Sequence, residues 1–274
     1  MIKTSVYGPV TRLDLARTIG GRGRYWTTAY LVGGMLVDSG CAHTAQELAS
    51  WLGERPLERI TNTHTHEDHI GANSLLQSLR PGLEILAHPL SLPVLSDPAR
   101  VQPLHPYRHL FWGMPRASEG RPLEAGSLIQ AGEFCFQVLY TPGHARDHLC
   151  LWEAERGWLF SGDLFVGGRD RALRAGCDIW EIIASLKKAA ALPVQTLFPG
   201  SARVRAENPL GALREKIAYL EELGGRVLDL HCRGWSVGAI ARSLCGGPLW
   251  IEAVTLGHFT RRHLVRSFLG QDSD

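Results

Sequence analysis

Strand-like and helix-like hydrophobic patterns alternate along the first three quarters of the chain. Runs of alternating or continuous apolar residues predict β-strands at 5–17, 25–37, 57–63, 84–89, 134–140, 148–153, 157–161 and 195–200. The run 25–37 is expected to form two strands, because it contains the turn dipeptide Gly33-Gly34. Helical spacing of apolar residues predicts helices at 43–53, in the later part of 63–79, and at 178–191. This alternation is typical of an α/β protein.

The pattern changes near residue 205, after which only helical periods follow. These predict helices at 207–223, 225–233, 236–245 and 250–269. We therefore expect a first domain at 1–205 and a helical C-terminal extension at 206–274. Residues 97–122 have no clean period and are rich in Pro, Arg, His and aromatic residues. An irregular segment of that length within a compact domain favours a lid or a wall of the substrate site.

The composition is that of an ordinary globular protein. Of 274 residues, 45% are hydrophobic and 20% charged, and the formal net charge is +2. This balance gives no general electrostatic reason to expect nucleic-acid or membrane binding. No apolar run approaches the roughly 20 residues that span a bilayer, and the first residues lack the layout of a secretory signal. Six cysteines without CxxC pairs argue against a zinc ribbon or a disulfide scaffold and favour a reducing cytoplasm.

Histidine is the unusual residue of this chain, with twelve copies. An H-x-H-x-D-H sequence follows a predicted strand and precedes a helix, and its members are His64, His66, Asp68 and His69. Imidazole and carboxylate ligands suit Zn, Mn or Fe, whereas softer sites need cysteines. His144 in TPGHARDH and Asp163 in SGDLF also follow predicted strands. The three loops therefore predict a metal site at one edge of a sheet sandwich.

These motifs resemble those of the metallo-β-lactamase superfamily. Asp38 after an early strand is followed by HTHEDH, TPGH and SGD in the order that the superfamily has, over residues from about 25 to 200. The resemblance implies a four-layer αβ/βα sandwich, in which two mixed sheets pack face to face with helices outside. It also implies two divalent metal ions, with zinc first and manganese or iron as alternatives.

The resemblance assigns a role to each motif residue. The first metal would be held by His64, His66 and His144, the second by Asp68 and His69, and Asp163 would bridge both. Asp68 would also orient the nucleophile and carry its proton to the leaving group. Asp38 would orient the HTHEDH loop from behind the ligands, as outer groups commonly do in metal sites.

The sequence departs from the superfamily at one ligand position. Many dinuclear members have a PGH sequence whose histidine completes the second site, and Ser201 in FPGSA stands at that position. Since serine is a weak ligand, the second site is completed by water, completed by another histidine, or left empty beside an occupied first site. His231 and His258 of the helical extension are candidate donors. His148, four residues after His144, is expected to fix the loop rather than to bind metal.

The expected function is hydrolysis of a small ester, thioester or lactone by a metal-activated hydroxide. The motifs are most similar to the branch of the superfamily that contains hydroxyacylglutathione hydrolases and lactonases. One alternative is a nuclease, which would use a helix predicted within 234–244 and the basic segment 261–268 on RNA or DNA. Another is a sulfur dioxygenase with a single iron, and a third is a metal-bearing effector without catalysis. A small-molecule substrate is favoured over nucleic acid because the basic excess is small, and the apolar helices of the extension are also compatible with a homodimer.

Overall fold

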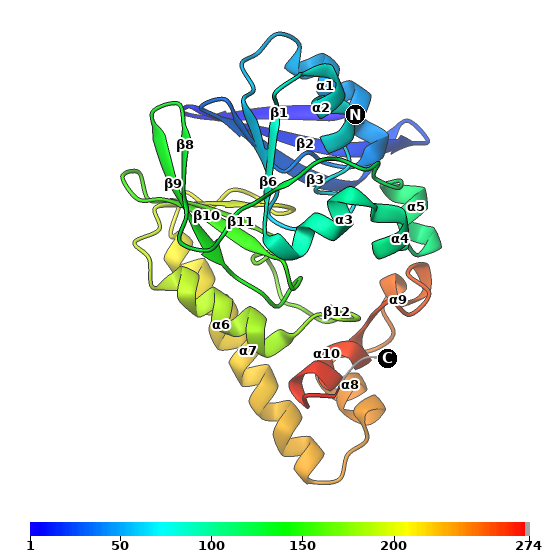
Figure 1. Ribbon diagram of the computed structural model, residues 1–274. Helices are drawn as coiled ribbons and strands as arrows, with labels where there is room; N and C mark the ends of the chain where they lie inside the picture. Colours follow the sequence, from blue (N-terminus) through cyan, green and yellow to red (C-terminus); the bar gives the residue numbers. More distant parts are fainter. Residues whose placement is uncertain (272–274) are drawn as a thin grey trace.

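Two β-sheets packed face to face form the centre of the molecule (Figure 1). A computed structural model describes residues 1–271. The first sheet contains seven strands in chain order: β1 Ile2–Tyr7, β2 Val10–Ile19, β3 Arg22–Val32, β4 Met35–Val37, β5 Arg59–Thr61, β6 Glu84–Ala87 and β7 Arg121–Pro122. Its pairs are antiparallel from β1 to β4 and parallel from β4 to β7.

The second sheet has five strands in the order β13-β11-β10-β9-β8. Their bounds are β8 Leu128–Ala131, β9 Phe134–Tyr140, β10 Leu149–Glu153, β11 Trp158–Gly162 and β13 Thr196–Pro199. Only the β11–β13 pair of this sheet is parallel. A separate two-stranded ribbon pairs β12 Leu173–Arg174 with β14 Phe259–Thr260. This ribbon joins the region before α6 to the C-terminal part of the chain.

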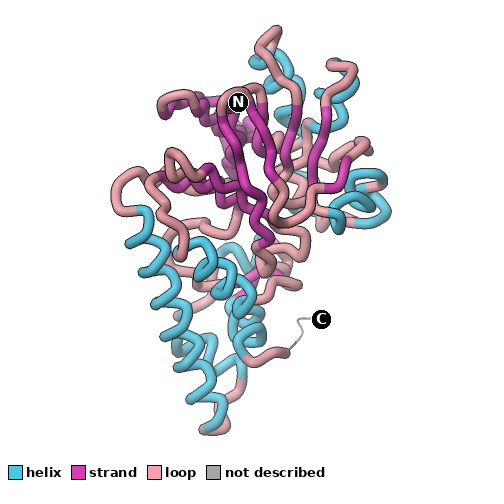
Figure 2. Tube along the Cα trace, turned by 60° about the vertical axis from the view of Figure 1, so that its left-hand side comes forward, coloured by secondary structure: helices cyan, strands magenta, loops and turns pink. Residues whose placement is uncertain are grey.

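Helices cover the outer face of each sheet, so the molecule has four layers (Figure 2). The first sheet is covered by α1 Ala45–Leu52, α2 Asn73–Leu79 and α3 Leu92–Ser96, and two short helices follow, α4 Pro98–Val101 and α5 Pro106–Phe111. The second sheet is covered by α6 Ile179–Ala190 and α7 Pro209–Cys232. Two further helices, α8 Val237–Cys245 and α10 Arg261–Phe268, pack on these two, with α9 Trp250–Val254 between them in the chain. The predicted αβ/βα sandwich with a helical C-terminal region is confirmed.

The core between the sheets is aromatic. Tyr30 of the first sheet packs edge-on against Phe160 and Phe198 of the second, and the two phenylalanine rings stack on each other. The Tyr30 hydroxyl donates a hydrogen bond to the Pro199 carbonyl oxygen at 2.7 Å. A buried tyrosine needs such a partner for its polar end. The bond also joins the two sheets at the end of β13, next to the site described below.

The C-terminal helices share one apolar core with the second sheet. Leu159 and Leu197 of the sheet lie in the same buried cluster as Ile183 of α6, Leu220 of α7 and Val265 of α10. Figure 1 shows α6 and α7 running side by side below the sheet. The domain boundary near residue 205 stays a prediction. None of the described helices has both the length and the apolar character needed to cross a bilayer.

Two sequence-based boundaries in the C-terminal region are wrong. Separate helices were expected at 207–223 and 225–233, but α7 is continuous through Gly224 and Gly225. A β-carbon on Gly224 would lie 2.9 Å from the Phe268 ring, so the glycine serves close packing of α7 against α10 and does not end the helix. Conversely, the helix expected at 250–269 is interrupted, because Phe259 and Thr260 leave it to pair with β12.

Other differences lie nearer the N-terminus. The strand expected at 5–17 is a hairpin of β1 and β2 that turns at Gly8-Pro9, and the irregular segment 97–122 contains α4, α5 and β7. The short strands β8 and β12 were not predicted. The two strands expected within 25–37 are confirmed as β3 and β4, which turn at Gly33-Gly34.

Candidate metal centre

Polar side chains from several loops meet at one edge of the sandwich. Asp38 follows β4, the HTHEDH loop follows β5, His144 follows β9 and Asp163 follows β11. The turn before His144 requires a glycine. Gly143 has φ of 122°, and a β-carbon there would lie 2.4 Å from the backbone nitrogen of Ile182 in α6. Only a residue without a side chain lets the chain pass so close to α6 and present His144 to the loop opposite.

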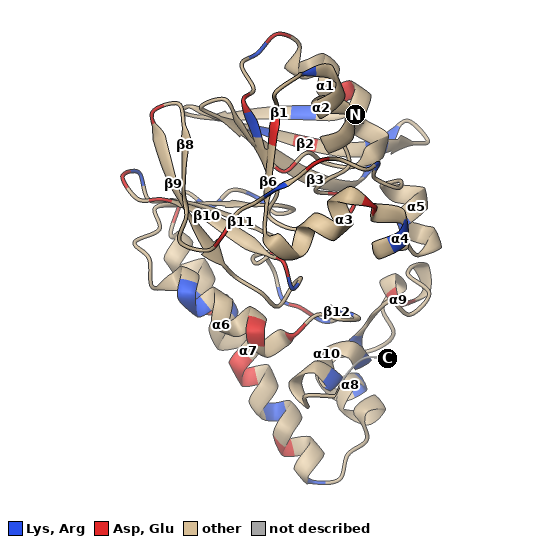
Figure 3. Cartoon of the chain, in the orientation of Figure 1, with Lys and Arg blue, Asp and Glu red and all other residues tan. Residues whose placement is uncertain are grey.

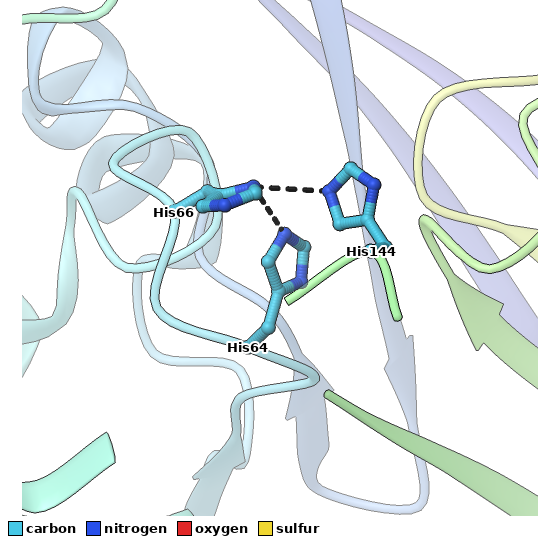
Figure 4. Close-up of side chains that lie close together, drawn as sticks. All are labelled: His64, His66 and His144. Carbon is cyan, nitrogen blue, oxygen red and sulfur yellow. Dashed lines mark hydrogen bonds between the residues drawn. The ribbon is translucent and has the colours of Figure 1, made fainter. Parts of the chain in front are cut away.

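His64, His66 and His144 form the first group of candidate ligands (Figure 4). His66 Nδ1 lies 2.9 Å from His64 Nε2 and 3.0 Å from His144 Nε2. In a tetrahedral zinc site with bonds of 2.0–2.1 Å, two nitrogen ligands lie about 3.3 Å apart. Both distances are therefore within a few tenths of an ångström of the spacing that a small cation requires.

The same histidines are held neutral by their surroundings. Burial lowers the pKa of His64 and of His66 well below the usual range, and neighbouring histidines and Arg174 lower both further. Burial likewise lowers the pKa of His144 to about 3, although Asp163 opposes the shift. A neutral imidazole has a free lone pair, so these groups are in the protonation state that metal binding needs.

His64, His69 and Asp163 form a second group, next to the first and sharing one histidine with it. His69 Nε2 is buried without a hydrogen-bond partner and lies 3.6 Å from Asp163 Oδ2 and 3.8 Å from Asp68 Oδ2. Burial by itself lowers the pKa of His69, but Asp38, Asp163 and Asp68 together raise it well above the usual value. The surroundings of Nε2 are thus rich in negative charge, which suits a cation.

The pKa values of the two carboxyl groups beside His69, those of Asp68 and Asp163, shift in opposite directions. Burial raises the pKa of Asp68 to about 6, and Glu67 and Asp163 add to the shift while His69 opposes it. Burial would raise the pKa of Asp163 as well, but the charges of His69 and His144 lower it below its usual range. Asp163 is therefore the permanently ionised member of the pair and Asp68 the member that exchanges a proton more readily.

Asp38 is buried and sets the orientation of two histidines. Its carboxylate accepts hydrogen bonds from the Thr63 backbone nitrogen at 2.7 Å, the Thr63 hydroxyl at 2.8 Å and His69 Nδ1 at 2.7 Å. Because the Thr63 hydroxyl donates to Asp38, it can only accept from His64 Nδ1, which lies 3.0 Å away. Both histidines then carry a proton on Nδ1 and present Nε2 to the candidate metal positions.

The remaining predicted residues lie at different distances from the two groups. The Ser201 hydroxyl donates to Asp163 Oδ1 at 3.0 Å, so it contacts the predicted bridging carboxylate. His148 Nε2 accepts from the Asp163 backbone nitrogen and its Nδ1 contacts the Thr141 hydroxyl, so both ring nitrogens are engaged in holding loops. His258 Nδ1 instead contacts the Tyr107 hydroxyl at 2.8 Å.

Neither candidate donor from the C-terminal helices belongs to a ligand group among residues 1–271. His258 stacks on the ring of His105 with 3.9 Å between centroids, and His231 is exposed near the end of α7. The structure therefore brings together His64, His66, His69, His144 and Asp163, with Asp68 beside them, and it does not bring His258 or His231 to them.

Sequence analysis missed two groups that fix the HTHEDH loop. Asp147 Oδ2 accepts from the Thr65 backbone nitrogen at 3.0 Å, the Thr65 hydroxyl at 2.6 Å and the Ser91 hydroxyl at 2.8 Å. Its position inside TPGHARDH was the available signal. The second group is the buried ion pair of Glu67 with Arg108. No local pattern could have found it, because the partners belong to separate segments.

A cavity of about 330 Å³ opens beside the two ligand groups. His66, Asp68, His144, Asp163 and Ser201 lie in its wall. The rest of the wall is largely apolar and includes the aromatic side chains of Tyr25, Trp26, Tyr107, Trp112 and Phe259. The prediction that 97–122 contributes to this wall holds for Tyr107, Arg108 and Trp112, whereas His105 and His109 of the same segment are exposed and do not line the cavity.

The metal-free protein is expected to be less stable at pH 5 than at pH 7. Histidines of the unfolded chain take up protons below about pH 6.5. In the folded chain, burial lowers the pKa of His144 to about 3 and of His148 to about 4, so both stay neutral at pH 5. The unfolded state therefore binds more protons between pH 6.5 and 4 and gains stability as the pH falls. Below pH 6.5, His69 is protonated in both the folded and the unfolded state, so it does not change the stability there. The raised pKa of Asp68 favours the folded state as the pH falls, but Asp68 is one group against several histidines.

Thermal unfolding in the presence of a chelator measures this difference. We expect a melting temperature several degrees lower at pH 5, and replacing the exposed His109 with glutamine should leave the difference unchanged. Equal melting temperatures at the two pH values would contradict the prediction.

The chain also matches a known protein family in sequence. Residues 23–201 match the family model described as the metallo-beta-lactamase superfamily. A hydroxyacylglutathione hydrolase from Thermosynechococcus vestitus is 31% identical over 140 residues, which cover 51% of this chain and 47% of that protein. The chain thus spans about half the length of the curated relatives it matches.

Solved structures give the same fold. The metallo-beta-lactamase family protein TTHA1429 from Thermus thermophilus superposes with a TM-score of 0.64 at 19% identity, covering 97% of this chain and 92% of that one. TTHA1623 in a di-iron-bound form superposes with a TM-score of 0.55 at 30% identity, covering 71% and 96%.

Proposed function

Since the chain belongs to the metallo-β-lactamase superfamily, we propose that it is a metal-dependent hydrolase of a small thioester or ester, with two divalent metal ions. One observation carries the proposal: two groups of candidate ligands share His64 and lie beside one cavity. The similarity to hydroxyacylglutathione hydrolases supports a thioester in first place. Lactones fit the same chemistry, because they too are attacked at an ester carbonyl.

In this proposal each ligand comes from the loops described above. His64, His66 and His144 hold the first ion. His69, Asp68 and Asp163 hold the second, and Asp163 is placed between the groups, with its Oδ2 3.6 Å from His69 Nε2 and 3.7 Å from His144 Nε2. When bound, the ions lower the pKa of water and polarise the carbonyl oxygen that is attacked.

The side chains around the ligands supply the rest of the reaction. Asp68 would accept the proton of the attacking water and deliver it to the leaving group, because its carboxylate lies in the cavity wall beside the candidate metal positions. Asp38 keeps His64 and His69 in the tautomer that binds metal. The aromatic part of the wall holds the substrate body and excludes water from the cavity.

The serine at position 201 lies close to the second group. A β-carbon on Gly200 would lie 2.7 Å from Asp163 Oδ1, and the Ser201 hydroxyl already contacts that oxygen. We infer that the Ser201 hydroxyl orients Asp163 and that water, rather than another side chain, completes the second site. The position of His258 on Tyr107 supports this inference, since that histidine has other partners.

Metal analysis of freshly purified protein tests the proposal. We expect about two equivalents of zinc per chain, as in a two-metal hydrolase. Replacing His69 with alanine should lower the content to about one equivalent, and the matched replacement of His258 with alanine should leave it unchanged. A loss in the His258 variant would show that His258 completes the second site after all.

Other metal contents point to the alternatives. About one equivalent of iron would favour the sulfur dioxygenase, and no metal after reconstitution would favour the non-catalytic effector.

The nuclease is less well supported, because Ile240 and Ala241 of α8 are buried in the core and acidic and basic side chains are interspersed along α7 (Figure 3). Salt-dependent binding to an RNA oligomer would favour it.

A further inference from the structure

We propose that Arg174 binds a carboxylate on the substrate, so that the protein prefers acyl thioesters or esters whose acyl group ends in an acid. This inference rests on the proposed hydrolase function and specifies its substrate class. It starts from the charges in the wall of the cavity.

Three cationic side chains line the cavity, and they differ in their partners. Arg108 forms a buried ion pair with Glu67, and Lys216 Nζ lies 2.6 Å from Asp170 Oδ2. Within residues 1–271, no acidic side chain lies within 4 Å of the Arg174 guanidinium. The carboxylates of Asp68 and Asp163 face the candidate metal positions. Among the described residues, Arg174 is thus the cation of this wall that has no ion-pair partner.

The surroundings of Arg174 leave its hydrogen-bonding capacity incomplete. Its Nε is buried and has no hydrogen-bond partner. A buried donor without a partner is costly. A bound anion would accept from it, and a guanidinium matches the two oxygens of a carboxylate better than any other side chain does.

The contact of the guanidinium with the metal centre cannot persist when the centre is loaded. Arg174 Nη1 contacts His66 Nε2. A guanidinium only donates, so this contact requires a lone pair on Nε2 and a proton on Nδ1. The proposed metal ligand is His66 Nδ1, which then must be free of a proton. Metal binding through Nδ1 therefore excludes the contact, and a guanidinium beside a loaded centre needs another acceptor.

The backbone around Arg174 fixes its place at the cavity. Arg174 lies in β12 and pairs with Phe259 of β14, which lines the same cavity. The Ala175 backbone nitrogen donates to the His258 carbonyl oxygen at 2.9 Å, next to the contact of His258 with Tyr107. The C-terminal extension thereby holds Arg174 against His66 of the first ligand group, on the side of the ring away from the candidate ligand atom Nδ1. An acid only a few bonds from the scissile carbonyl could reach Arg174.

Two matched thioesters of N-acetylcysteamine test the proposal. One carries a succinyl group, which ends in a carboxylate, and the other the corresponding carboxamide, which has the same shape without the charge. We expect the zinc-loaded wild type to prefer the succinyl thioester in kcat/KM by on the order of 10–100-fold, the range for charge-assisted hydrogen bonds. In Arg174→Gln, kcat/KM for the succinyl thioester should fall while kcat/KM for the carboxamide stays unchanged, so that the preference is lost. Arg174→Lys should keep part of the preference. Arg169→Gln, an equal charge change on the same segment outside this cavity, should keep it in full.

A binding measurement separates failure of this inference from failure of the proposed function. Calorimetry with the corresponding thioethers, which lack the scissile carbonyl, should give weaker binding of the acid to Arg174→Gln than to wild type, each loaded with zinc. Should neither thioester be hydrolysed while this difference persists, the carboxylate site stands and the thioesterase function fails. Equal affinities in the two proteins would overturn the carboxylate site, because the acid would then bind the metal or nothing. Equal kcat/KM values of the wild type for the two thioesters would also overturn the carboxylate site.

Discussion

Replacing Asp68 with asparagine is expected to lower kcat for a thioester by on the order of 10²–10⁴-fold, the range for a lost general acid–base group. The amide keeps the shape of the side chain but takes up no proton at neutral pH. Asp68 lies in the cavity wall, 3.8 Å from the unpartnered His69 Nε2, and among the described residues no other carboxylate in that wall except Asp163 faces the ligand groups. Asp163 cannot readily take over the proton, because the charges of His69 and His144 lower its pKa despite its burial.

The measurement pairs steady-state kinetics with the zinc content of the same preparation. A normal zinc content with a fallen kcat assigns Asp68 to proton transfer, whereas a reduced content assigns it to holding the second ion. Asp229→Asn, on the exposed surface of α7, controls for the loss of one negative charge and should behave as wild type. Activity of the Asp68 variant within threefold of wild type would contradict both roles.

Replacing Asp38 with asparagine is expected to weaken zinc binding by about 100-fold or more, at the upper end of the effects of groups behind metal ligands. The asparagine oxygen must still accept from the Thr63 backbone nitrogen, so its NH₂ faces His69 Nδ1 and the Thr63 hydroxyl. Both contacts then reverse direction. His69 carries its proton on Nε2, and the Thr63 hydroxyl donates to His64 Nδ1, which leaves the proton of His64 on Nε2 as well.

One substitution thus puts two candidate ligands into the tautomer that cannot bind metal. The fold should be retained, because Asp38 has φ of 59° and asparagine adopts that conformation readily. Competition with a chelator measures zinc affinity, and thermal unfolding of the metal-free variant confirms folding. Asp14→Asn is the matched control, since Asp14 also accepts from a threonine hydroxyl in the first sheet but does not contact the histidines. Unchanged zinc affinity in the Asp38 variant would contradict the tautomer argument.

The order of strands and helices in the sandwich was largely predictable, because it depends on periodicity within short windows. The turn at Gly33-Gly34 and the helix at 178–191 were predicted within a few residues of their bounds. The errors occur where distant segments decide the outcome. α7 continues through Gly224 because Phe268 packs there, and the helix expected at 250–269 is interrupted because Phe259 pairs with β12.

The sequence likewise predicted one part of the candidate site and could not predict another. The HTHEDH, TPGH and SGD motifs identified the candidate ligands by sequence alone, since loops that follow neighbouring strands converge at one sheet edge. Sequence could not decide between His258 and water at the second site, because that depends on where the C-terminal helices lie. It also could not show that Asp147 and the Glu67–Arg108 pair hold the loop.

By itself, then, the sequence determined the sandwich, its family resemblance and the set of candidate ligands, all of which are encoded in local patterns of polarity and spacing. Only the tertiary structure decided that the tail packs on the second sheet, that His258 contacts Tyr107, and that Arg174 reaches the cavity without an acidic partner among the described residues. The physical reason is that burial and charge balance are sums over contacts between segments far apart in the chain. No window of sequence contains both sides of such a contact.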